Sequence, residues 1–305
     1  MSLTLRFLGT AASRPTVERN VSSAVVVREG ETLMFDCGEG TQRQMMRYGT
    51  GFGFNDIFFT HLHGDHFFGV PGLLRTLALQ DREEPMDLWC PRGGEAVLRQ
   101  AVELGGDRLA FEVRYHALEP GERIERGAYD IVAFRTQHGG RSLGYALVEH
   151  ERLGRFDPEK AKALGVPEGP LWGKLHRGED VEVEGRTVRA ADLVGPPRPG
   201  RTVVYTGDTR PTAATREVAA GADLLIHEAT FAHDEAERAV TTGHSTAREA
   251  ARLARDAGVH RLVITHFSPR YADDPRPLER EARAVFRDTV AAYDGLVVEV
   301  PYRES

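Results

Sequence analysis

The sequence has 305 residues, of which 41% are hydrophobic and 28% are charged, and its formal net charge is −7. This composition is that of a soluble globular protein and excludes a disordered chain, which would contain fewer apolar residues. The negative charge argues against a protein that coats nucleic acid over its whole surface, because such proteins carry an excess of basic residues.

Strand-like and helix-like segments alternate along the first half of the chain. Runs rich in β-branched and apolar residues predict strands, and apolar residues spaced three or four apart predict helices. The predicted strands are residues 3–8, 23–28, 32–36, 56–60, 111–115, 129–136 and 143–148. The predicted helices are residues 39–48, with Met45 and Met46 as core candidates, 71–79, and 94–104, which Gly105 and Gly106 should end.

Residues 150–200 differ in composition from the rest of the chain, since glycine and proline are dense there and only one short helix, residues 158–164, is predicted. Between residues 152 and 177, six basic and three acidic side chains give a local charge of +3. A solvated surface insertion is one interpretation, and an arm that touches an anionic partner is the other. The basic residues are Arg152, Arg155, Lys160, Lys162, Lys174 and Arg177.

Alternation resumes after residue 200. Strands are predicted at residues 202–206, 223–226, 261–265 and 295–300, and helices at residues 245–257 and 277–293. Thr246 and Glu249 have the spacing of a capping box, and Gly258 is a stop signal for the helix between them. We therefore expect a single layered α/β domain over residues 1–305, with sheets buried between helices and residues 150–200 inserted as an arm.

A dense cluster of histidines, His61-Leu62-His63-Gly64-Asp65-His66, follows the predicted strand 56–60. For this composition the pattern has a chance level of roughly one in a thousand chains. In extended geometry His61 and His63 project to the same side, and Gly64 permits a tight reversal. Two imidazoles suit one zinc ion, and the pair Asp65 and His66 suits a second.

Two metals need more ligands than this cluster supplies. His138, Asp208 and His266 each come directly after a predicted strand, and Asp36 ends one. Each alone is an ordinary polar loop residue, but together they form a consistent set at strand ends.

These motifs resemble the metallo-β-lactamase superfamily and, within it, the ribonuclease Z family of tRNA 3′-end endonucleases. One departure is Val17, where many members carry a lysine. Residues 165–174, which contain Gly169-Pro170, are similar to the family's tRNA-binding arm. The other supporting motifs are Phe7-Leu8-Gly9-Thr10, residues 14–23, residues 35–42, His227-Glu228-Ala229-Thr230, Gly243-His244-Ser245-Thr246 and residues 266–271.

The resemblance implies a four-layer αβ/βα sandwich that holds two Zn²⁺ per chain. It implies that Asp208 bridges the two ions and that Asp36 orients a ligand histidine. One zinc would be held by His61, His63 and His138. The other would be held by Asp65, His66 and His266.

The resemblance also implies the chemistry. A water activated between the metals would attack the phosphorus, with Asp65 as general base, while His244, oriented by Glu228, would protonate the leaving ribose 3′-oxygen. We expect His227 to be structural. Cleavage would leave a 3′-hydroxyl on the tRNA and a 5′-phosphate on the trailer.

The expected partners are precursor tRNA, gripped by the basic arm, and a second copy of the chain in a homodimer, with no DNA and no membrane. The two cysteines, Cys37 and Cys90, are expected to be free thiols in a reducing cytoplasm, and no signal peptide is expected.

Two alternatives stay open on the sequence alone. Another dinuclear-zinc hydrolase of the same fold, such as a small phosphodiesterase, arylsulfatase or lactonase, would use the same ligands. A non-enzymatic RNA-binding protein with structural zinc is the other, although structural sites leave no open position for water. The ligand types also accept Mn²⁺ or Co²⁺.

Overall fold

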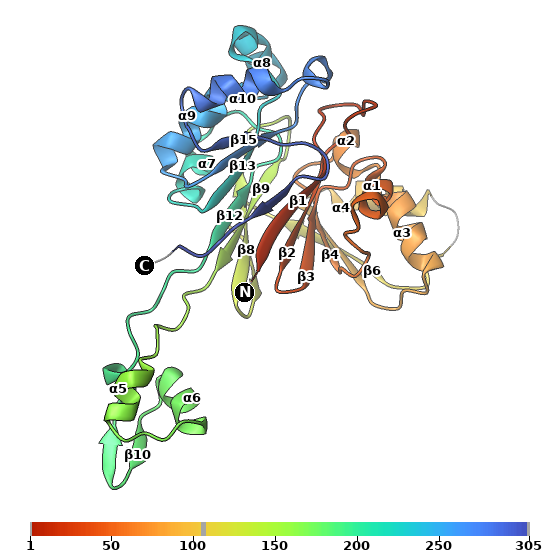
Figure 1. Ribbon diagram of the computed structural model, residues 1–305. Coiled ribbons are helices and arrows are strands. Elements are labelled where there is room, and N and C mark those ends of the chain that lie inside the picture. The colour runs from red at the N-terminus through yellow and green to blue at the C-terminus, as the bar shows by residue number, and fades with distance from the viewer. Residues whose placement is uncertain (1, 105–107, 304–305) are drawn as a thin grey trace.

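The computed structural model describes residues 2–104 and 108–303 as two seven-stranded sheets that face each other, with helices on both outer sides (Figure 1). The first sheet has the order β16-β1-β2-β3-β4-β5-β6 and the second β15-β14-β13-β12-β9-β8-β7. The strands of the first are β1 (Leu3–Gly9), β2 (Ser23–Arg28), β3 (Glu31–Phe35), β4 (Asp56–Phe58), β5 (Met86–Pro91), β6 (Val113–Leu118) and β16 (Val297–Glu299). Those of the second are β7 (Arg123–Arg126), β8 (Tyr129–Arg135), β9 (Leu143–Glu149), β12 (Thr202–Tyr205), β13 (Leu224–Glu228), β14 (Leu262–Thr265) and β15 (Thr289–Ala291).

The inner faces of the two sheets bury one apolar core. Aromatic rings meet across it: Phe35 stacks on Phe58 with ring centroids 5.3 Å apart, and Tyr145 of the opposite sheet meets Phe58 edge-on at 5.4 Å. Such contacts add to the burial energy of the rings themselves. The predicted α/β sandwich of four layers is therefore confirmed.

The outer layers are helical and each closes its own apolar cluster against a sheet. On the first sheet lie α1 (Thr41–Tyr48), α2 (Gly64–Phe67), α3 (Val70–Leu79) and α4 (Glu95–Glu103). On the second lie α7 (Ala213–Val218), α9 (Ala247–Ala257) and α10 (Arg276–Arg283), while α8 (Ala236–Thr242) belongs to the segment between β13 and α9. Along the ranges 2–104 and 108–303, no helix is long and apolar enough to cross a membrane.

Local sequence signals predicted some features of the fold correctly and others incorrectly. The capping box of Thr246 and Glu249 is present at the start of α9, and Gly258 ends that helix in the left-handed conformation. Met45 is buried, but Met46 is 60% exposed, so its expected place in the core was wrong. The expected stop of α4 at residues 105–106 lies outside the described residues.

The long helix expected over residues 277–293 was wrong. The helix α10 ends at Arg283, and the chain then forms the edge strand β15, in which Val290 lies opposite Val263 of β14. The segment from Val285 to Val290 contains β-branched and aromatic residues, which pair well on a sheet edge. Pairing with a strand distant in sequence therefore overrode the local helical pattern.

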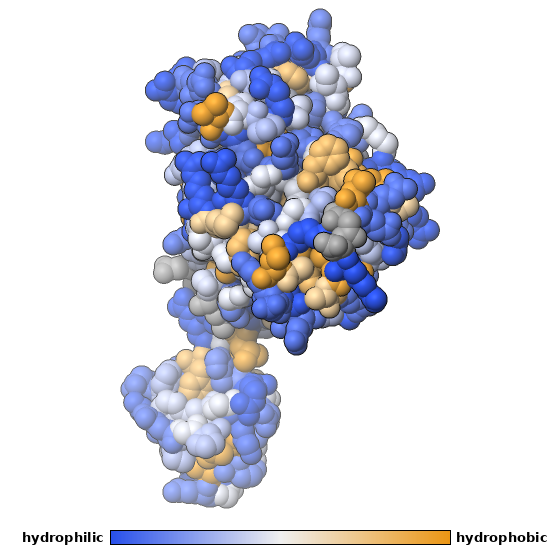
Figure 2. All heavy atoms as spheres, turned by 90° about the vertical axis from the view of Figure 1, so that its right-hand side faces the viewer, coloured by the Kyte–Doolittle hydropathy of each residue, from blue (hydrophilic) through white to orange (hydrophobic). Residues whose placement is uncertain are grey.

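Residues 150–200 leave the second sheet as two irregular strands and end in a small lobe that stands away from the body (Figures 1 and 2). Only one of its helices was predicted. The lobe has an apolar centre of its own, which includes Ala161, Leu175 and Val181. Its elements are α5 (Pro158–Ala163), α6 (Pro170–His176), β10 (Val181–Val183) and β11 (Arg186–Val188).

Candidate metal centre

The strand order brings the carboxyl ends of β3, β4, β8, β12, β13 and β14 to one edge of the sandwich. Strands β3 and β4 are parallel to each other in the first sheet, and β12, β13 and β14 are parallel in the second. Strand β8 has the same direction as β12, because each of the two is antiparallel to β9. The loops after these strands carry seven predicted ligands. This histidine–aspartate cluster consists of His61, His63, Asp65, His66, His138, Asp208 and His266.

Three imidazole nitrogens of the cluster meet at one point. His61 Nε2 lies 3.0 Å from His63 Nδ1, and His138 Nε2 lies 3.1 Å from the same His63 nitrogen. His61 and His138 are buried, whereas His63 is exposed. These three histidines are the ones that the family resemblance assigns to one metal.

A second group lies beside the first, and Asp208 lies between them. His266 Nε2 is 3.5 Å from Asp65 Oδ2, and His66 Nε2 is 3.7 Å from the same oxygen. Asp208 Oδ2 is 3.7 Å from His61 Nε2 and 3.4 Å from His66 Nε2, and its Oδ1 is 3.2 Å from His266 Nε2. A carboxylate in this position is able to bridge two ions.

A glycine is required to bring Asp208 this close. Gly207 adopts a φ of +60°, and a β-carbon on it would lie 2.6 Å from the side chain of Thr60. Both the backbone conformation and the close approach therefore favour glycine before Asp208.

Hydrogen bonds fix the tautomers of the first two buried histidines. Asp36 accepts a bond of 2.9 Å from His66 Nδ1. The Thr60 hydroxyl, which donates its proton to Asp36, lies 3.1 Å from His61 Nδ1 and so accepts from it. In each ring the proton sits on Nδ1, and the Nε2 lone pair faces the cluster.

The other two buried histidines follow the same rule. The carbonyl oxygen of Gly243 accepts from His138 Nδ1 at 3.0 Å. Thr230 donates its hydroxyl proton to Glu228 at 2.7 Å and accepts from His266 Nδ1 at 3.0 Å. Such outer partners orient metal ligands and raise their basicity.

The residues fit a metal, as their unpaired atoms show. Within residues 2–104 and 108–303, the buried atoms His66 Nε2, His266 Nε2 and Asp208 Oδ1 have no hydrogen-bond partner. Lone pairs that converge in a buried space without protons between them are costly unless a cation joins them. Imidazole and carboxylate ligands of this kind suit zinc.

The pKa values of the cluster are shifted in opposite directions. Burial disfavours the charged ring of His66, but Asp208 and Asp36 outweigh it and raise the pKa of His66 well above its usual value. Burial, together with the neighbouring histidines, lowers the pKa of His61, which favours the neutral ring. Burial opposes the charge of Asp208, but His266 and His66 hold the pKa of its carboxyl well below the usual range.

Beside the cluster lies the predicted acid pair. His244 Nδ1 is 2.8 Å from Glu228 Oε1 and 3.9 Å from Asp208 Oδ2. Burial disfavours a charged ring, but the Glu228 carboxylate outweighs it and raises the pKa of His244 to about 9. Glu228 also accepts the Thr209 backbone N–H at 3.0 Å, so this buried carboxylate is fully bonded.

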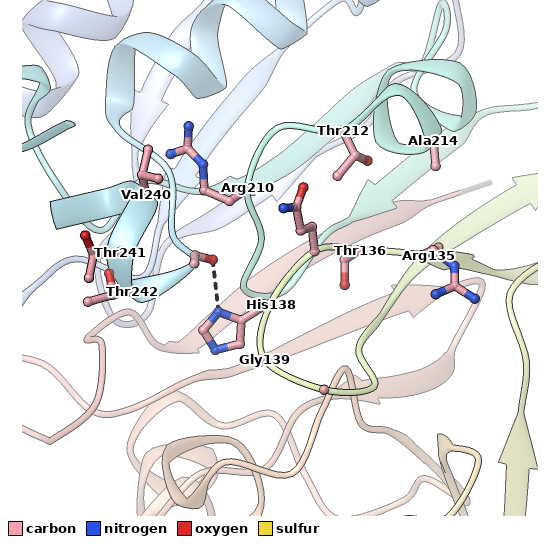
Figure 3. A pocket seen from close by; sticks show the side chains of 13 residues that line it. Arg135, Thr136, His138, Gly139, Arg210, Thr212, Ala214, Val240, Thr241 and Thr242 are labelled. Atoms are coloured by element: carbon pink, nitrogen blue, oxygen red, sulfur yellow. Dashed lines mark hydrogen bonds between the residues drawn. The ribbon is translucent and has the colours of Figure 1, made fainter. Parts of the chain in front are cut away.

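A cleft of about 650 Å³ opens on the His138 side of the cluster. Figure 3 shows Arg135, the last residue of β8, with Thr136 and His138 of the loop that follows, across the cleft from Thr241 and Thr242 at the end of α8. The mix of arginine, hydroxyl and glycine along its walls suits a polar, anionic substrate. Of the seven predicted ligands, His138 alone lines this cleft.

The predicted arm residues lie away from this centre, in the lobe and its stalk (Figure 1). Over residues 150–200 nine acidic side chains balance nine basic ones, so the segment as a whole has no net charge. The net charge of +3 belongs to residues 152–177 alone. Of the 39 basic residues, 36 are arginine, and the three lysines all lie in the lobe, as Lys160, Lys162 and Lys174. Their predicted contact with substrate stays a prediction.

Sequence reasoning missed the residues that hold the ligands from behind. Thr60 directly precedes His61, and Thr230 closes the motif His227-Glu228-Ala229-Thr230, so both lay within recognised motifs. The Ser13 backbone N–H, which donates to Asp65 Oδ2 at 2.7 Å, carries no sequence signal. His227 is buried in β13, with its Nδ1 2.7 Å from the backbone oxygen of Glu228.

Comparison with known proteins gives a consistent result. A profile described as "Metallo-beta-lactamase superfamily" matches residues 16–266. Two curated relatives named "Ribonuclease Z", from Gemmatimonas aurantiaca and Haloferax volcanii, are 57% and 56% identical; each match covers 100% of this chain, and 98% and 97% of the relative. The crystal structure of human tRNase Z, short form, superposes with a TM-score of 0.72 at 30% identity, covering 98% of this chain and 99% of that one.

Proposed function

Because this chain belongs to the ribonuclease Z family of the metallo-β-lactamase superfamily, we propose that it is an endoribonuclease that removes 3′ trailers from tRNA precursors. The observation that carries the proposal is the pairing of two features at one sheet edge. One is the convergent set of imidazole and carboxylate atoms, and the other is the buried His244–Glu228 pair beside it.

Two zinc ions per chain would be held by the histidine–aspartate cluster, with Asp208 between them. When bound, they would activate water and neutralise phosphate charge. The protein's own side chains would do the rest. Asp65, held by the Ser13 N–H, would accept the proton of the attacking water, and His244 would deliver a proton to the ribose 3′-oxygen as it leaves.

The lobe of residues 150–200 would supply the grip on RNA. A single phosphodiester group offers too few contacts to be positioned precisely at the metal centre. A folded tRNA is large enough to contact the protruding lobe at the same time. The three lysines favour contacts with phosphate, since a lysine is a compact and mobile point charge. Residues 179–184 include four acidic side chains, which leaves the α5–α6 side as the one that would face the RNA.

A homodimer is part of the proposal. Exposed apolar side chains gather on the outer helices of the first sheet: Met46 of α1, Phe68 after α2 and Leu79 of α3 are 60%, 61% and 85% exposed. Figure 2 shows apolar patches on this face of the body. Such a surface supports self-association. Cys37 and Cys90 are free and buried, which supports action in the reducing cytoplasm.

The experiment that tests the proposal compares two substrates. Purified metal-loaded protein is given a 3′-extended pre-tRNA and, in parallel, a bis-aryl phosphodiester, and its metal content is measured by elemental analysis. We expect two zinc ions per chain and endonucleolytic cleavage of the pre-tRNA at the trailer junction. Hydrolysis of the small diester without cleavage of pre-tRNA would assign the protein to the small-molecule hydrolases of this fold instead.

A further inference from the structure

The root of the arm is closed by an arginine that is buried to an unusual degree. Arg201, just before β12, is 1% exposed. It binds Glu149, the last residue of β9, through Nε at 2.8 Å and Nη2 at 2.7 Å, and its Nη1 donates to the Val300 oxygen at 3.0 Å. The two strands that carry the arm therefore leave the body from one ion pair.

An aromatic ring joins this root to the arm itself. Tyr302 lies between two guanidinium groups, with its ring centroid 3.9 Å from Arg201 Cζ and 3.3 Å from Arg152 Cζ. Arg152 belongs to the stalk, where its backbone exchanges hydrogen bonds of 2.8 and 2.9 Å with Arg198 of the returning strand. The ring thus contacts one arginine of the body and one of the arm.

The segment that carries Tyr302 is fixed to the body on both sides of the ring. Before it, the Val300 N–H donates to the Leu3 oxygen at 2.9 Å. After it, Arg303 Nε pairs with Asp223 Oδ1 at 2.8 Å, and Asp223 also accepts the Thr202 N–H. Because these contacts anchor the Tyr302 ring to the body, the stacking contact ties Arg152, and with it the stalk, to the body.

The stalk beyond this point makes contacts within itself and with the lobe: Arg198 Nε donates to the Leu153 oxygen at 3.1 Å, and His176 Nε2 lies 3.0 Å from the Gly154 oxygen. It is a ladder of isolated bridges, Arg152 with Arg198 and Phe156 with Val194, and the lobe stands clear of the body (Figure 1). A stacked pair of arginines on one ring is the kind of contact that restricts rotation about such a root, because cation–π attraction favours one geometry.

We propose that Tyr302 is a positioning residue for the long substrate: through Arg152 it holds the arm at the angle at which an RNA bound to the lobe also reaches the metal centre. The inference rests on the proposed function for its consequence in catalysis, but its geometric part is independent of that function. It gives Arg152 a role at the root of the arm besides its predicted contact with RNA.

The geometric part is tested by a distance measurement. Spin labels are placed on two exposed alanines, Ala163 of α5 and Ala220 of the body, each changed to cysteine. Cys37 and Cys90 do not compete, because burial raises the pKa of each thiol to about 12. Double electron–electron resonance spectroscopy should give a narrow distribution of distances between the two labels in the parent and in Tyr302→Phe. The distribution should be broad in Tyr302→Ala. An unchanged distribution in Tyr302→Ala would overturn the proposal.

The catalytic part is tested by steady-state kinetics. Tyr302→Ala should raise KM for pre-tRNA roughly fivefold to tenfold, with kcat within about twofold and bis-aryl phosphodiester hydrolysis unchanged. Tyr302→Phe, which keeps the ring, should restore KM, and Tyr293→Ala, at a 55% exposed tyrosine, should match the parent. An unchanged KM, or equal loss on both substrates, contradicts the positioning role. A parent enzyme inactive on pre-tRNA would refute the proposed function, while the distance measurement would still decide the role of Tyr302.

Discussion

Two residues of the metal centre hold a backbone conformation that side chains other than glycine rarely adopt. Asp36 has a φ of 56° and His266 a φ of 58°, and both stand at the end of a strand. A positive φ turns the chain sharply, so that the side chain points into the cluster rather than along the sheet. Residues held in this region cost about 1–3 kcal/mol and persist where surrounding contacts determine them. At Asp36 those contacts include Thr60, His66 and Tyr205.

The acid pair gives the first prediction at this scale. His244→Ala should lower the rate of pre-tRNA cleavage by at least ~10²-fold, because the leaving oxygen loses its proton donor. Both zinc ions should remain bound. Glu228→Gln should also slow cleavage, since the charge that favours protonated His244 is removed. Single-turnover rates and metal content are the measurements, with His116→Ala as the control.

The zinc content decides between two roles for His244. Its ring lies close enough to His138 and Asp208 to join a ligand set with them. If His244→Ala retains two zinc ions but cleaves slowly, His244 acts as the general acid. A variant that loses one ion shows that His244 is a ligand.

Acid sensitivity is predicted at the arm root. Burial would raise the pKa of Glu149, but hydrogen bonds from Arg201 outweigh burial and lower it to about 2. The folded-state pKa lies below the unfolded value, so this stabilisation is complete above about pH 5 and is lost as the pH falls toward 2. Glu149→Gln should lower the unfolding free energy at pH 7 by about 3 kcal/mol, because the buried charges of Arg201 and Arg28 then lose the carboxylate that balances them.

Denaturant unfolding at several pH values checks this prediction. The difference between the parent and Glu149→Gln should shrink steadily between pH 5 and pH 3. Glu151→Gln, at an exposed neighbour, should behave like the parent. A difference that stays constant with pH would mean that Glu149 does not titrate in this range.

At the scale of elements, how far the sequence predicts the structure depends on whether the signal is local. The ligands were predictable, since they lie in short motifs or directly after strongly apolar strands. The edge strand β15 was not, because its pairing partner β14 lies 24 residues or more earlier and only the fold brings them together. The helix α6 and the hairpin β10–β11 were hidden by the density of glycine and proline around them.

The arm gives the prediction at this scale. Gly154 and Gly195 cross so closely that a β-carbon on Gly154 would lie 1.8 Å from the Gly195 oxygen, which makes this crossing a natural place to cut. Replacement of residues 154–195 by a short Gly-Ser linker should leave both zinc ions and bis-aryl phosphodiester hydrolysis intact. Cleavage of pre-tRNA should fall steeply, mainly through lost binding, and the salt dependence of RNA binding should flatten.

Two results would contradict this reading of the arm. Normal processing of pre-tRNA by the shortened protein would make the arm a plain surface insertion. Loss of both activities with zinc still bound would mean that the arm supports the metal centre.

The lysines allow contact between arm and RNA to be seen directly. An amine-selective reagent has only three side-chain targets in this chain, and all three lie in the lobe. With pre-tRNA bound to the Asp65→Ala variant, mass spectrometry should show Lys160 and Lys174 protected from modification. Lys162, which already pairs with Glu159 and Glu168, should change less. Equal modification with and without RNA would exclude these contacts.

At the scale of the whole molecule, the fold separates chemistry from recognition. The seven predicted ligands follow four strand ends, those of β4, β8, β12 and β14, at one edge of the two sheets. The arm leaves the opposite part of the second sheet on its own stalk (Figure 1). Under the proposed function, a chain with a net charge of −7 would bind RNA through a local group of cations. Weak non-specific binding to other nucleic acids is an expected consequence.

The central claim is that water attacks phosphorus and expels the ribose 3′-oxygen at the end of the tRNA. Cleavage of a 3′-extended pre-tRNA in ¹⁸O-labelled water, followed by mass analysis of both products, tests it most directly. We expect one ¹⁸O atom in a 5′-phosphate on the trailer and an unlabelled 3′-hydroxyl on the tRNA. A 2′,3′-cyclic phosphate or a 3′-phosphate on the tRNA would contradict the account, because the 2′-hydroxyl or the opposite bond would then have reacted.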